Sequence, residues 1–385
     1  MISATILSDS LNEFGNRLTT LKIVMPRYIL AEFNTHRMIS KNSASSRAIP
    51  FKRMIESVNN KPFVPYAWQK DHPGMQGVEY LDKEKSFAAS VYWLDGRDAA
   101  TRWAQLVNGL AGATKQLANR MIEPYMWHTV ICTATEWENF FSLRCPQFVM
   151  EYKHNGAAIS ENVYRSRKDL MREEDVKDVG IIDWKKMNKG QADIHIMELA
   201  ECIWDAMNES DPIKVAEYDW HLPYGDIENI DGIIYHHESY LGKSVSKLES
   251  FATSQRNSYK LKISTARCAR ISYETLGDNP KIDYEADINL HDRLLKSDPL
   301  HASPAEHQGR SMTRDEFLAY SKTYIVSEIT PQLQTQIDMG WAAADTPFLL
   351  NGPNKNDFFI TEFGWCRNFR GFIPYRHLLE NNMSL

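Results

Sequence analysis

The sequence has few cysteines and no arrangement of them that would staple a fold or hold a metal. Five cysteines are scattered through 385 residues, and none form a Cys-x-x-Cys pair. An odd, sparse set is typical of reduced thiols and argues against both a disulfide framework and a zinc site. We therefore expect no metal and a cytoplasmic location.

Long apolar runs and an excess of basic residues are also missing. No run approaches the length of a membrane span, and the opening "MISATILSDSLNEF" lacks a basic region followed by a long apolar one. These absences predict neither a membrane protein nor a signal peptide. A formal net charge of -6 without long basic tracts argues against nucleic-acid binding. An anionic small ligand remains compatible, because arginines can cluster locally.

Common catalytic motifs are missing as well. The chain has no glycine-rich phosphate loop and no Gly-x-Ser-x-Gly elbow, so a nucleophilic triad built on Ser45 and His36 is disfavoured. The segment "YHHES" offers His236, His237 and Glu238, but adjacent histidines rarely both ligate one metal. A polar loop is the better interpretation of that segment.

What is present is a globular composition, 43% hydrophobic and 24% charged, long enough for one large or two ordinary domains. Local patterns predict a series of elements. They are a strand over 18–24, a helix from Pro26, irregular chain over 53–95, helices over 100–122 and 125–144, a charged insertion over 150–190, a helix over 192–207, a strand leading into a helix over 260–274, and a helix over 284–297.

The segment "NTHRMISKNSASSRAIP", residues 34–50, has an unusual density of hydrogen-bond donors. It begins at the end of the helix from Pro26 and is expected to be a polar loop. Elsewhere, single arginines interrupt apolar segments; with those of this stretch they are Arg37, Arg47, Arg120, Arg144 and Arg270. Each alone fits an ordinary salt-bridged arginine. Together, with Asn139 shortly before Arg144, they suit a planar ligand that bears phosphate, which arginine forks bind bidentately.

The segment "THRMISKNSASSR" resembles the signature of the flavin-dependent thymidylate synthases, which are also called thymidylate synthase complementing proteins. That signature is roughly Arg-His-Arg, seven residues, Ser, one residue, Arg, and His36, Arg37, Ser45 and Arg47 fall on it. Four further blocks resemble segments of the same family. They are "ANRMIEP" with Arg120, "ENFFSLR" with Asn139 and Arg144, "ARCARISY", and "HASPAEH" with His301, Ser303 and Glu306.

The order of the blocks departs from the family. "HASPAEH" ordinarily precedes the His-Arg block, whereas here it comes about 260 residues later. The resemblance therefore implies a circularly permuted and enlarged member of the kind that occurs in bacteriophages. The implied fold is α+β, one domain over 1–385 with a central antiparallel or mixed sheet flanked by helices. Insertions are expected at about 53–95, 146–190 and 308–360.

Two substitutions also depart from the family pattern. Thr35 stands where the first signature arginine, a flavin contact, is usual, and Ser43 stands where a glutamate near the nucleotide sugar is usual. We expect Arg370 or Arg376 of the terminal segment "NFRGFIPYR" to replace the missing cation, or else to be an ordinary surface arginine.

The resemblance implies a role for each site residue. The substrate would be bound by Ser45, Ser46, Arg47, Arg120 and Arg144, with Arg120 and Arg144 also catalytic. FAD and folate would be contacted by His36, Arg37, Ser40, Asn42, Asn139, His301, Ser303 and Glu306. We expect Arg47, Arg120 and Arg144 to converge on the nucleotide.

The implied reaction is one-carbon transfer from methylenetetrahydrofolate to C5 of a deoxypyrimidine monophosphate, dUMP to dTMP, with FAD as cofactor and NADPH as reductant. Two alternatives remain open. One is methylation or hydroxymethylation of dCMP or dUMP to make a modified nucleotide for phage DNA, and the other is a non-catalytic flavin- or nucleotide-binding relic. A homo-oligomer, tetramer or dimer, is implied because flavin sites of the family lie between subunits. If the chain is phage-encoded, its location would be the cytoplasm of the host cell.

Overall fold

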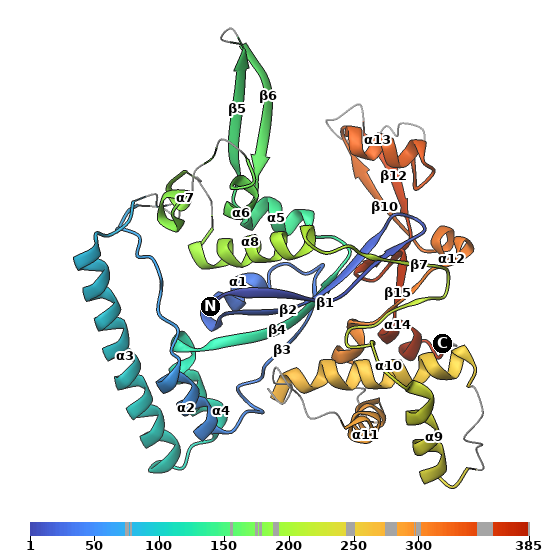
Figure 1. Cartoon of the computed structure of the whole chain (residues 1–385), viewed down its shortest axis with the longest axis horizontal. Helices are drawn as coiled ribbons and strands as arrows, with labels where there is room; N and C mark the ends of the chain where they lie inside the picture. Colours follow the sequence, from blue (N-terminus) through green and yellow to red (C-terminus); the bar gives the residue numbers. More distant parts are fainter. Residues whose placement is uncertain are drawn as a thin grey trace.

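A five-stranded mixed sheet forms the centre of the computed structural model (Figure 1). In spatial order its strands are β3 (Ser40–Ser43), β4 (Trp127–Ala134), β2 (Arg17–Pro26), β1 (Ser3–Asn12) and β7 (Ile213–Val215). β7 runs parallel to β1, and all other neighbours in this sheet are antiparallel. The structure describes residues 1–383 apart from 74–76, 78, 155–156, 174–175, 177–178, 188–191, 244–250, 274–282, 296, 298–301 and 345–356.

Strand β2 shows why this sheet forms. It is rich in β-branched and apolar residues, and its residues 18–21 are all buried. A strand buried on both faces carries a nearly continuous apolar run, in contrast to the alternation of a half-exposed strand. The expected strand over 18–24 is therefore confirmed.

Helices cover both faces of the sheet. On one face Leu21 and Ile23 pack against Phe33, Phe140 and Leu199. The helical segments of this face are η1 (Arg27–Ile29), α1 (Leu30–Phe33), α5 (Glu138–Arg144) and α8 (Ile194–Asn208). Asp193 caps α8 by accepting a hydrogen bond from the His195 backbone N–H. The helix expected over 192–207 is confirmed.

The opposite face carries a second helical layer. Ile131 of β4 packs there against Cys268 and Ile271, because neighbouring residues of a strand point to opposite faces. This layer contains α9 (Ile230–Tyr240), α10 (Thr253–Arg270), η3 (Ile271–Tyr273), α11 (Tyr284–Leu295) and η4 (Ser303–Glu306). α10 runs along the sheet in Figure 1. Residues 260–273 are helical, so the strand expected at the start of 260–274 is wrong.

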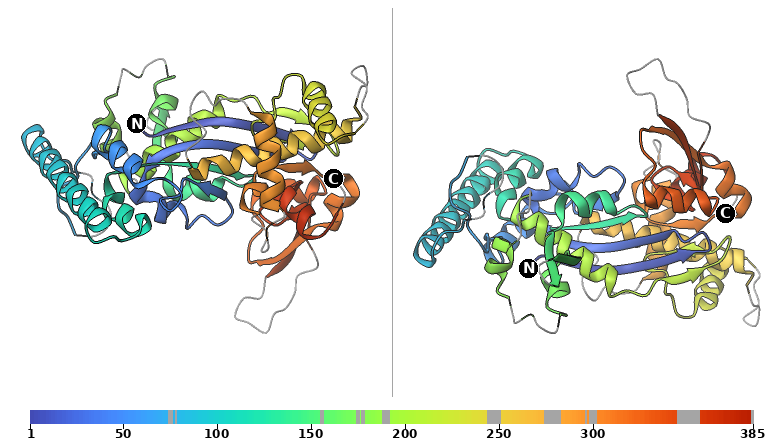
Figure 2. Two further views of the ribbon diagram at one scale, coloured as in Figure 1. Left: turned by 90° about the horizontal axis from the view of Figure 1, so that it is seen from below. Right: turned by 90° about the horizontal axis from the view of Figure 1, so that it is seen from above.

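Residues 51–125 form a helical group at one end of the molecule (Figure 2). Its members are α2 (Phe51–Asn60), α3 (Lys83–Gly109), α4 (Lys115–Ala118) and η2 (Asn119–Tyr125). The expectation of irregular chain over 53–95 is thus wrong for 53–60 and 83–95, which are helical, and correct for the described residues of 61–82. Asp82 accepts a hydrogen bond from the Lys85 backbone N–H and starts α3 well before the apolar periodicity becomes visible.

The remaining segments are short strands and helices. A hairpin within the expected 146–190 insertion projects beyond α5 and α8, away from the central sheet (Figure 1). That insertion contains β5 (Phe148–His154), β6 (Ala157–Tyr164), α6 (Arg167–Leu170) and α7 (Ile181–Met187). The C-terminal part contains α12 (Arg314–Ala319), β10 (Ser321–Val326), α13 (Pro331–Asp338), β11 (Ala342–Ala344) and β12 (Phe358–Phe363).

Two small sheets contain the last strands of the chain. β15 (Phe372–Pro374), β9 (Gly309–Ser311) and β8 (Trp220–His221) form one, and β13 (Trp365–Cys366) with β14 (Phe369–Arg370) forms a tight hairpin. Helix α14 (Tyr375–Glu380) follows. The α+β class with a mixed sheet between helices is confirmed, whereas the permuted order stays a prediction. Within the described ranges, no helix combines the length and apolarity that crossing a membrane would need.

Candidate functional site

The donor-rich stretch runs along the edge of the central sheet. Its middle is β3, which corrects the expectation of a loop throughout. Among the strands that the structure describes, β3 pairs with β4 alone. Asn42 is buried and its Nδ2 donates to the carbonyl of Cys268 at 2.8 Å. The Ser45 N–H donates to the carbonyl of Ser272 at 3.0 Å. The end of α10 and the following η3 therefore hold this stretch in place.

A cavity of about 260 Å³ lies beside β3 and joins segments that are far apart in the sequence. Ser40 of β3 and Glu306 of η4 both line it. The "HASPAEH" and "THRMISKNSASSR" blocks thus each contribute one residue to a single cavity of one chain. Ser303 begins η4, and His301 lies outside the described residues.

Three residues of the C-terminal segment complete the polar lining of the cavity. They are Arg367, Asn368 and Arg376. Arg376 forms an ion pair with Glu306, and Asn368 Nδ2 donates to the Arg37 carbonyl at 3.2 Å. Of the two arginines that we expected to replace the missing cation, Arg376 is therefore at the cavity. Arg370 is buried beside Glu362, with Nη1 3.6 Å from Oε1.

Arg144 belongs to a second group, next to His36. Its Nε donates to His36 Nε2 at 3.1 Å, and its Nη1 pairs with Glu32. Burial, together with the nearby Arg144 and Lys41, lowers the pKa of His36 to about 4. His36 is consequently neutral at pH 7, which leaves Nε2 free to accept from the arginine.

The other two predicted nucleotide-binding arginines lie with the serines that follow β3. Asn119 Nδ2 donates to the Ser46 carbonyl at 2.8 Å and so ties the Arg120 segment to Ser46. Arg120 is 60% exposed and lies 3.9 Å from Glu123. Arg47 is exposed, and its guanidinium has no partner among the described residues. Within one chain, then, Arg47 and Arg120 share a neighbourhood and Arg144 has a different set of partners.

The remaining predicted residues have simpler surroundings. Arg37 is exposed and follows the buried His36, while Asn139 is exposed on the surface of α5. Arg270 Nε donates to Asp287 at 2.7 Å, so the ordinary salt-bridge interpretation holds for this residue. Among the described residues, no group of three or more His, Cys, Asp or Glu side chains is placed to hold a metal ion.

Arg367 and Asn368 were not found from the sequence. They form the two-residue loop between β13 and β14, where Trp365 pairs with Arg370 and Cys366 with Phe369. The terminal segment was recognised as a source of arginines, but nothing in "WCRNFRG" marks which of them meets β3. That choice depends on the hairpin, which is a contact between distant segments.

The donor set of the cavity fits the phosphate-bearing part of FAD. Two arginines, a buried serine and an amide surround it, and such groups bind phosphate oxygens. A volume of about 260 Å³ is smaller than the roughly 300–1,000 Å³ usual for sites that enclose a whole drug-sized ligand. The rest of a dinucleotide would therefore lie outside this cavity.

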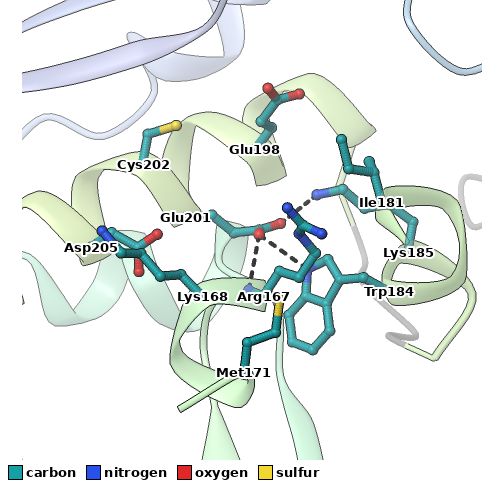
Figure 3. A pocket seen from close by; sticks show the side chains of 10 residues that line it. All are labelled: Arg167, Lys168, Met171, Ile181, Trp184, Lys185, Glu198, Glu201, Cys202 and Asp205. Carbon is teal, nitrogen blue, oxygen red and sulfur yellow. Dashed lines mark hydrogen bonds and ion pairs between the residues drawn. The ribbon is translucent and has the colours of Figure 1, made fainter. Parts of the chain in front are cut away.

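A second cavity, of about 370 Å³, lies between α6, α7 and α8 (Figure 3). Glu201 points into the middle of the labelled side chains, where it pairs with the buried Lys185 and accepts from Trp184 Nε1 at 3.0 Å. No residue that the sequence analysis assigned to a site lines this cavity. Its central charges already satisfy one another, so we regard it as part of the packing of the insertion against α8.

Comparisons with known proteins give little independent support. No protein-family model matches the chain, and no curated protein sequence matches it. Among solved structures, the UMP/dUMP methylase PolB from Streptomyces cacaoi bound with 5-Br UMP is similar at 14% identity and a TM-score of 0.36, covering 54% of this chain and 89% of that one. The same enzyme bound with 5-Br dUMP gives 10% identity, a TM-score of 0.35 and coverages of 54% and 91%. A likeness this weak does not establish a family, so the functional argument rests on the residues themselves.

Proposed function

We propose that the protein transfers a one-carbon unit from methylenetetrahydrofolate to C5 of a deoxypyrimidine monophosphate, with FAD as cofactor and NADPH as reductant. The observation that carries the proposal is the cavity shared by Ser40 and Glu306. These residues belong to two blocks that resemble the same family and are separated by about 260 residues of sequence. A chance resemblance in either block would give no reason for them to line one cavity.

In this proposal, different arginines bind different parts of the nucleotide. The unpartnered guanidinium of Arg47 binds the phosphate, and the hydroxyl of Ser45, which accepts from the Arg47 N–H at 3.3 Å, keeps the loop turned. Arg120 lies beside the same loop through Asn119. Arg47 and Arg120 are both exposed, so a phosphate can reach their guanidinium groups.

Arg144 would act on the pyrimidine ring. C5 becomes nucleophilic only when negative charge on the ring is stabilised, and a fixed guanidinium near the carbonyl oxygens does this. Glu32 and neutral His36 hold the guanidinium from one side. The second terminal nitrogen of Arg144, Nη2, has no partner among the described residues and remains for the ring.

The cofactor-binding set comprises Arg37, Ser40 of β3 and Glu306 of η4. His36 precedes Arg37, and Asn42 fixes β3 through the carbonyl of Cys268. When bound, FAD would supply a redox-active ring that takes hydride from NADPH and passes it on. The chain's residues bind and orient the ligands. A homo-oligomer, tetramer or dimer, stays part of the proposal, because flavin sites of the family lie between subunits and Arg144 shares no partner with Arg47 or Arg120 among the described residues.

The decisive experiment is product analysis. Purified protein is incubated with FAD, NADPH and methylenetetrahydrofolate, with either dUMP or dCMP, and the nucleotides are identified by mass spectrometry. A C5-methyl dUMP product that requires every component is the expected result. A dCMP product or a hydroxymethyl group would identify the modified-nucleotide alternative. Nucleotide and flavin binding without any product would show a non-catalytic relic and contradict the proposal.

A further inference from the structure

The loop between β13 and β14 holds an arginine in a backbone conformation that ordinarily suits glycine. Arg367 has a φ of 56°, in the left-handed region. It is the first of the two loop residues of this hairpin, a position at which φ above zero favours glycine, asparagine or aspartate. An arginine there is strained, and strain of this kind persists where the side chain has a use.

The Arg367 side chain reaches the cavity beside β3, where it is joined by Arg376. Arg367 pairs with Glu380, and Arg376 Nε donates to the other oxygen of the same carboxylate at 2.7 Å. Arg376 also pairs with Glu306. Glu380 therefore bridges the two arginines. Each arginine keeps one terminal nitrogen that has no partner among the described residues, Nη1 in Arg367 and Nη2 in Arg376.

The charges around the cavity leave room for an anion. Arg367 and Arg376 balance Glu306 and Glu380, and the exposed Arg37 lies next to the same loop, since Asn368 holds its carbonyl. Ser40 and Asn368 add neutral donors. A bridging carboxylate between two arginines has the geometry that a phosphate oxygen pair would take.

We propose that Arg367 and Arg376 form an anion site for the pyrophosphate of the flavin dinucleotide. Glu380 forms ion pairs with both arginines until the ligand displaces its carboxylate. The site takes the place of the arginine that Thr35 lacks. This inference rests on the proposed function for the identity of the ligand, but its anion-binding part can be measured without any turnover.

The test titrates the full-length protein with inorganic pyrophosphate, FAD and dUMP by calorimetry. Arg367→Gly and Arg376→Ala should each weaken pyrophosphate and FAD binding by about tenfold or more, because a charge-assisted bond is lost. Glu380→Gln should strengthen both by several-fold, because the competing carboxylate is gone. Affinity for dUMP should stay within about twofold in all three variants.

The glycine variant also distinguishes a loss of binding from a loss of folding. Glycine suits the backbone of residue 367, so Arg367→Gly should melt at or above the parent temperature while binding less. Arg102→Ala on α3, at the far end of the molecule (Figure 2), is the matched control and should leave every affinity unchanged.

Several outcomes would overturn the inference. They are unchanged pyrophosphate and FAD affinities in Arg367→Gly and Arg376→Ala, a loss confined to dUMP, or no pyrophosphate binding by the parent protein. The proposed function fails separately. If the parent protein binds pyrophosphate through these arginines but forms no product with either nucleotide, the anion site stands and the one-carbon transfer does not. If product forms at parental rates in both arginine variants, the one-carbon transfer stands and the anion site does not.

Discussion

Two arginines of the candidate site differ in how they are held, and this difference predicts different kinetic defects. Arg144 is fixed by Glu32 and His36, whereas Arg47 is exposed and unpartnered among the described residues. A fixed guanidinium is suited to charge that develops during the reaction, so Arg144→Ala should lower kcat more than it raises KM. Arg47→Ala should weaken nucleotide binding by about 2–3 kcal/mol with less effect on kcat.

Steady-state kinetics with calorimetric nucleotide binding separates these effects. Arg47→Lys keeps the charge and loses the fork, so it should recover only part of the binding. FAD content should remain near that of the parent in all variants. If Arg47→Ala bound nucleotide as well as the parent and lost its flavin, the loop would serve the cofactor and the assignment would be wrong.

At the scale of single residues, the sequence identified site residues that lie in motifs resembling a family. It did not identify site residues whose position depends on contacts between distant segments. Ser40 and Glu306 were both assigned to the cofactor side, and they line one cavity. Arg367 and Asn368 also line it, yet they were not identified. Their place follows from a two-residue hairpin loop that reaches β3 from the other end of the chain, and no local pattern encodes that approach.

At the scale of elements, the helix expected over 125–144 is wrong in an instructive way. Its first half is β4 (Trp127–Ala134) and only its end is α5 (Glu138–Arg144). The apolar content of "WHTVICTA" fits a buried helix and a buried strand equally well, but its β-branched residues favour the strand. This segment forms a strand because it pairs with β2 on one side and β3 on the other. Both pairings are long-range interactions, which a local pattern does not show.

The turn before the β13–β14 hairpin supports a stability prediction. Gly364 has a φ of 83°, and a Cβ added there would lie 2.2 Å from Cε2 of Phe317. Gly364→Ala therefore combines backbone strain with a clash against a buried ring. Gly340 has a φ of 75° and no atom within 4 Å of the added Cβ, which makes it the matched control for strain alone.

Gly340→Ala should reduce the free energy of unfolding by about 1–2 kcal/mol, the usual cost of the left-handed conformation. Gly364→Ala should cost about 1–3 kcal/mol more than that, because Phe317 must move within a packed core. Chemical denaturation of the two variants measures the difference. Equal losses would show that the ring has room to shift and that the hairpin is less tightly held than the structure indicates.

At the scale of the whole molecule, a chain of buried polar groups passes through the central sheet and joins β8 to the residue that follows η4. His221 Nε2 lies 2.8 Å from Thr20 Oγ1, which lies 2.7 Å from Thr133 Oγ1, which in turn lies 2.8 Å from His307 Nδ1. Thr20 and Thr133 face each other in the β2–β4 register. A buried network of this kind favours one register of the sheet, because a slipped strand would leave each group unpaired.

The same burial makes the fold sensitive to acid. Burial lowers the pKa of His221 to about 3, although Asp9 acts in the opposite direction, and burial alone lowers the pKa of His307 to about 3. Burial and the nearby Arg27 lower the pKa of His128 to about 3. In the unfolded chain each of these histidines takes up a proton near pH 6.5. Between about pH 6.5 and pH 3 the unfolded state therefore binds more protons than the folded state.

Stability should consequently fall as the pH drops below about 6.5, by about 1.4 kcal/mol per pH unit for each buried histidine and about 4 kcal/mol per unit for the three together. Burial raises the pKa values of Glu136 and Glu198, and these carboxyls offset part of the loss. Denaturant unfolding between pH 7 and pH 5 measures the slope. Replacing His128 by asparagine should reduce it by about 1.4 kcal/mol per unit, with the same substitution at the exposed His236 as the control. A stability that did not change over this range would mean that these histidines take up protons at the same pH in the folded protein as in the unfolded chain, and the hydrogen-bonded chain from His221 to His307 would then have to be arranged differently.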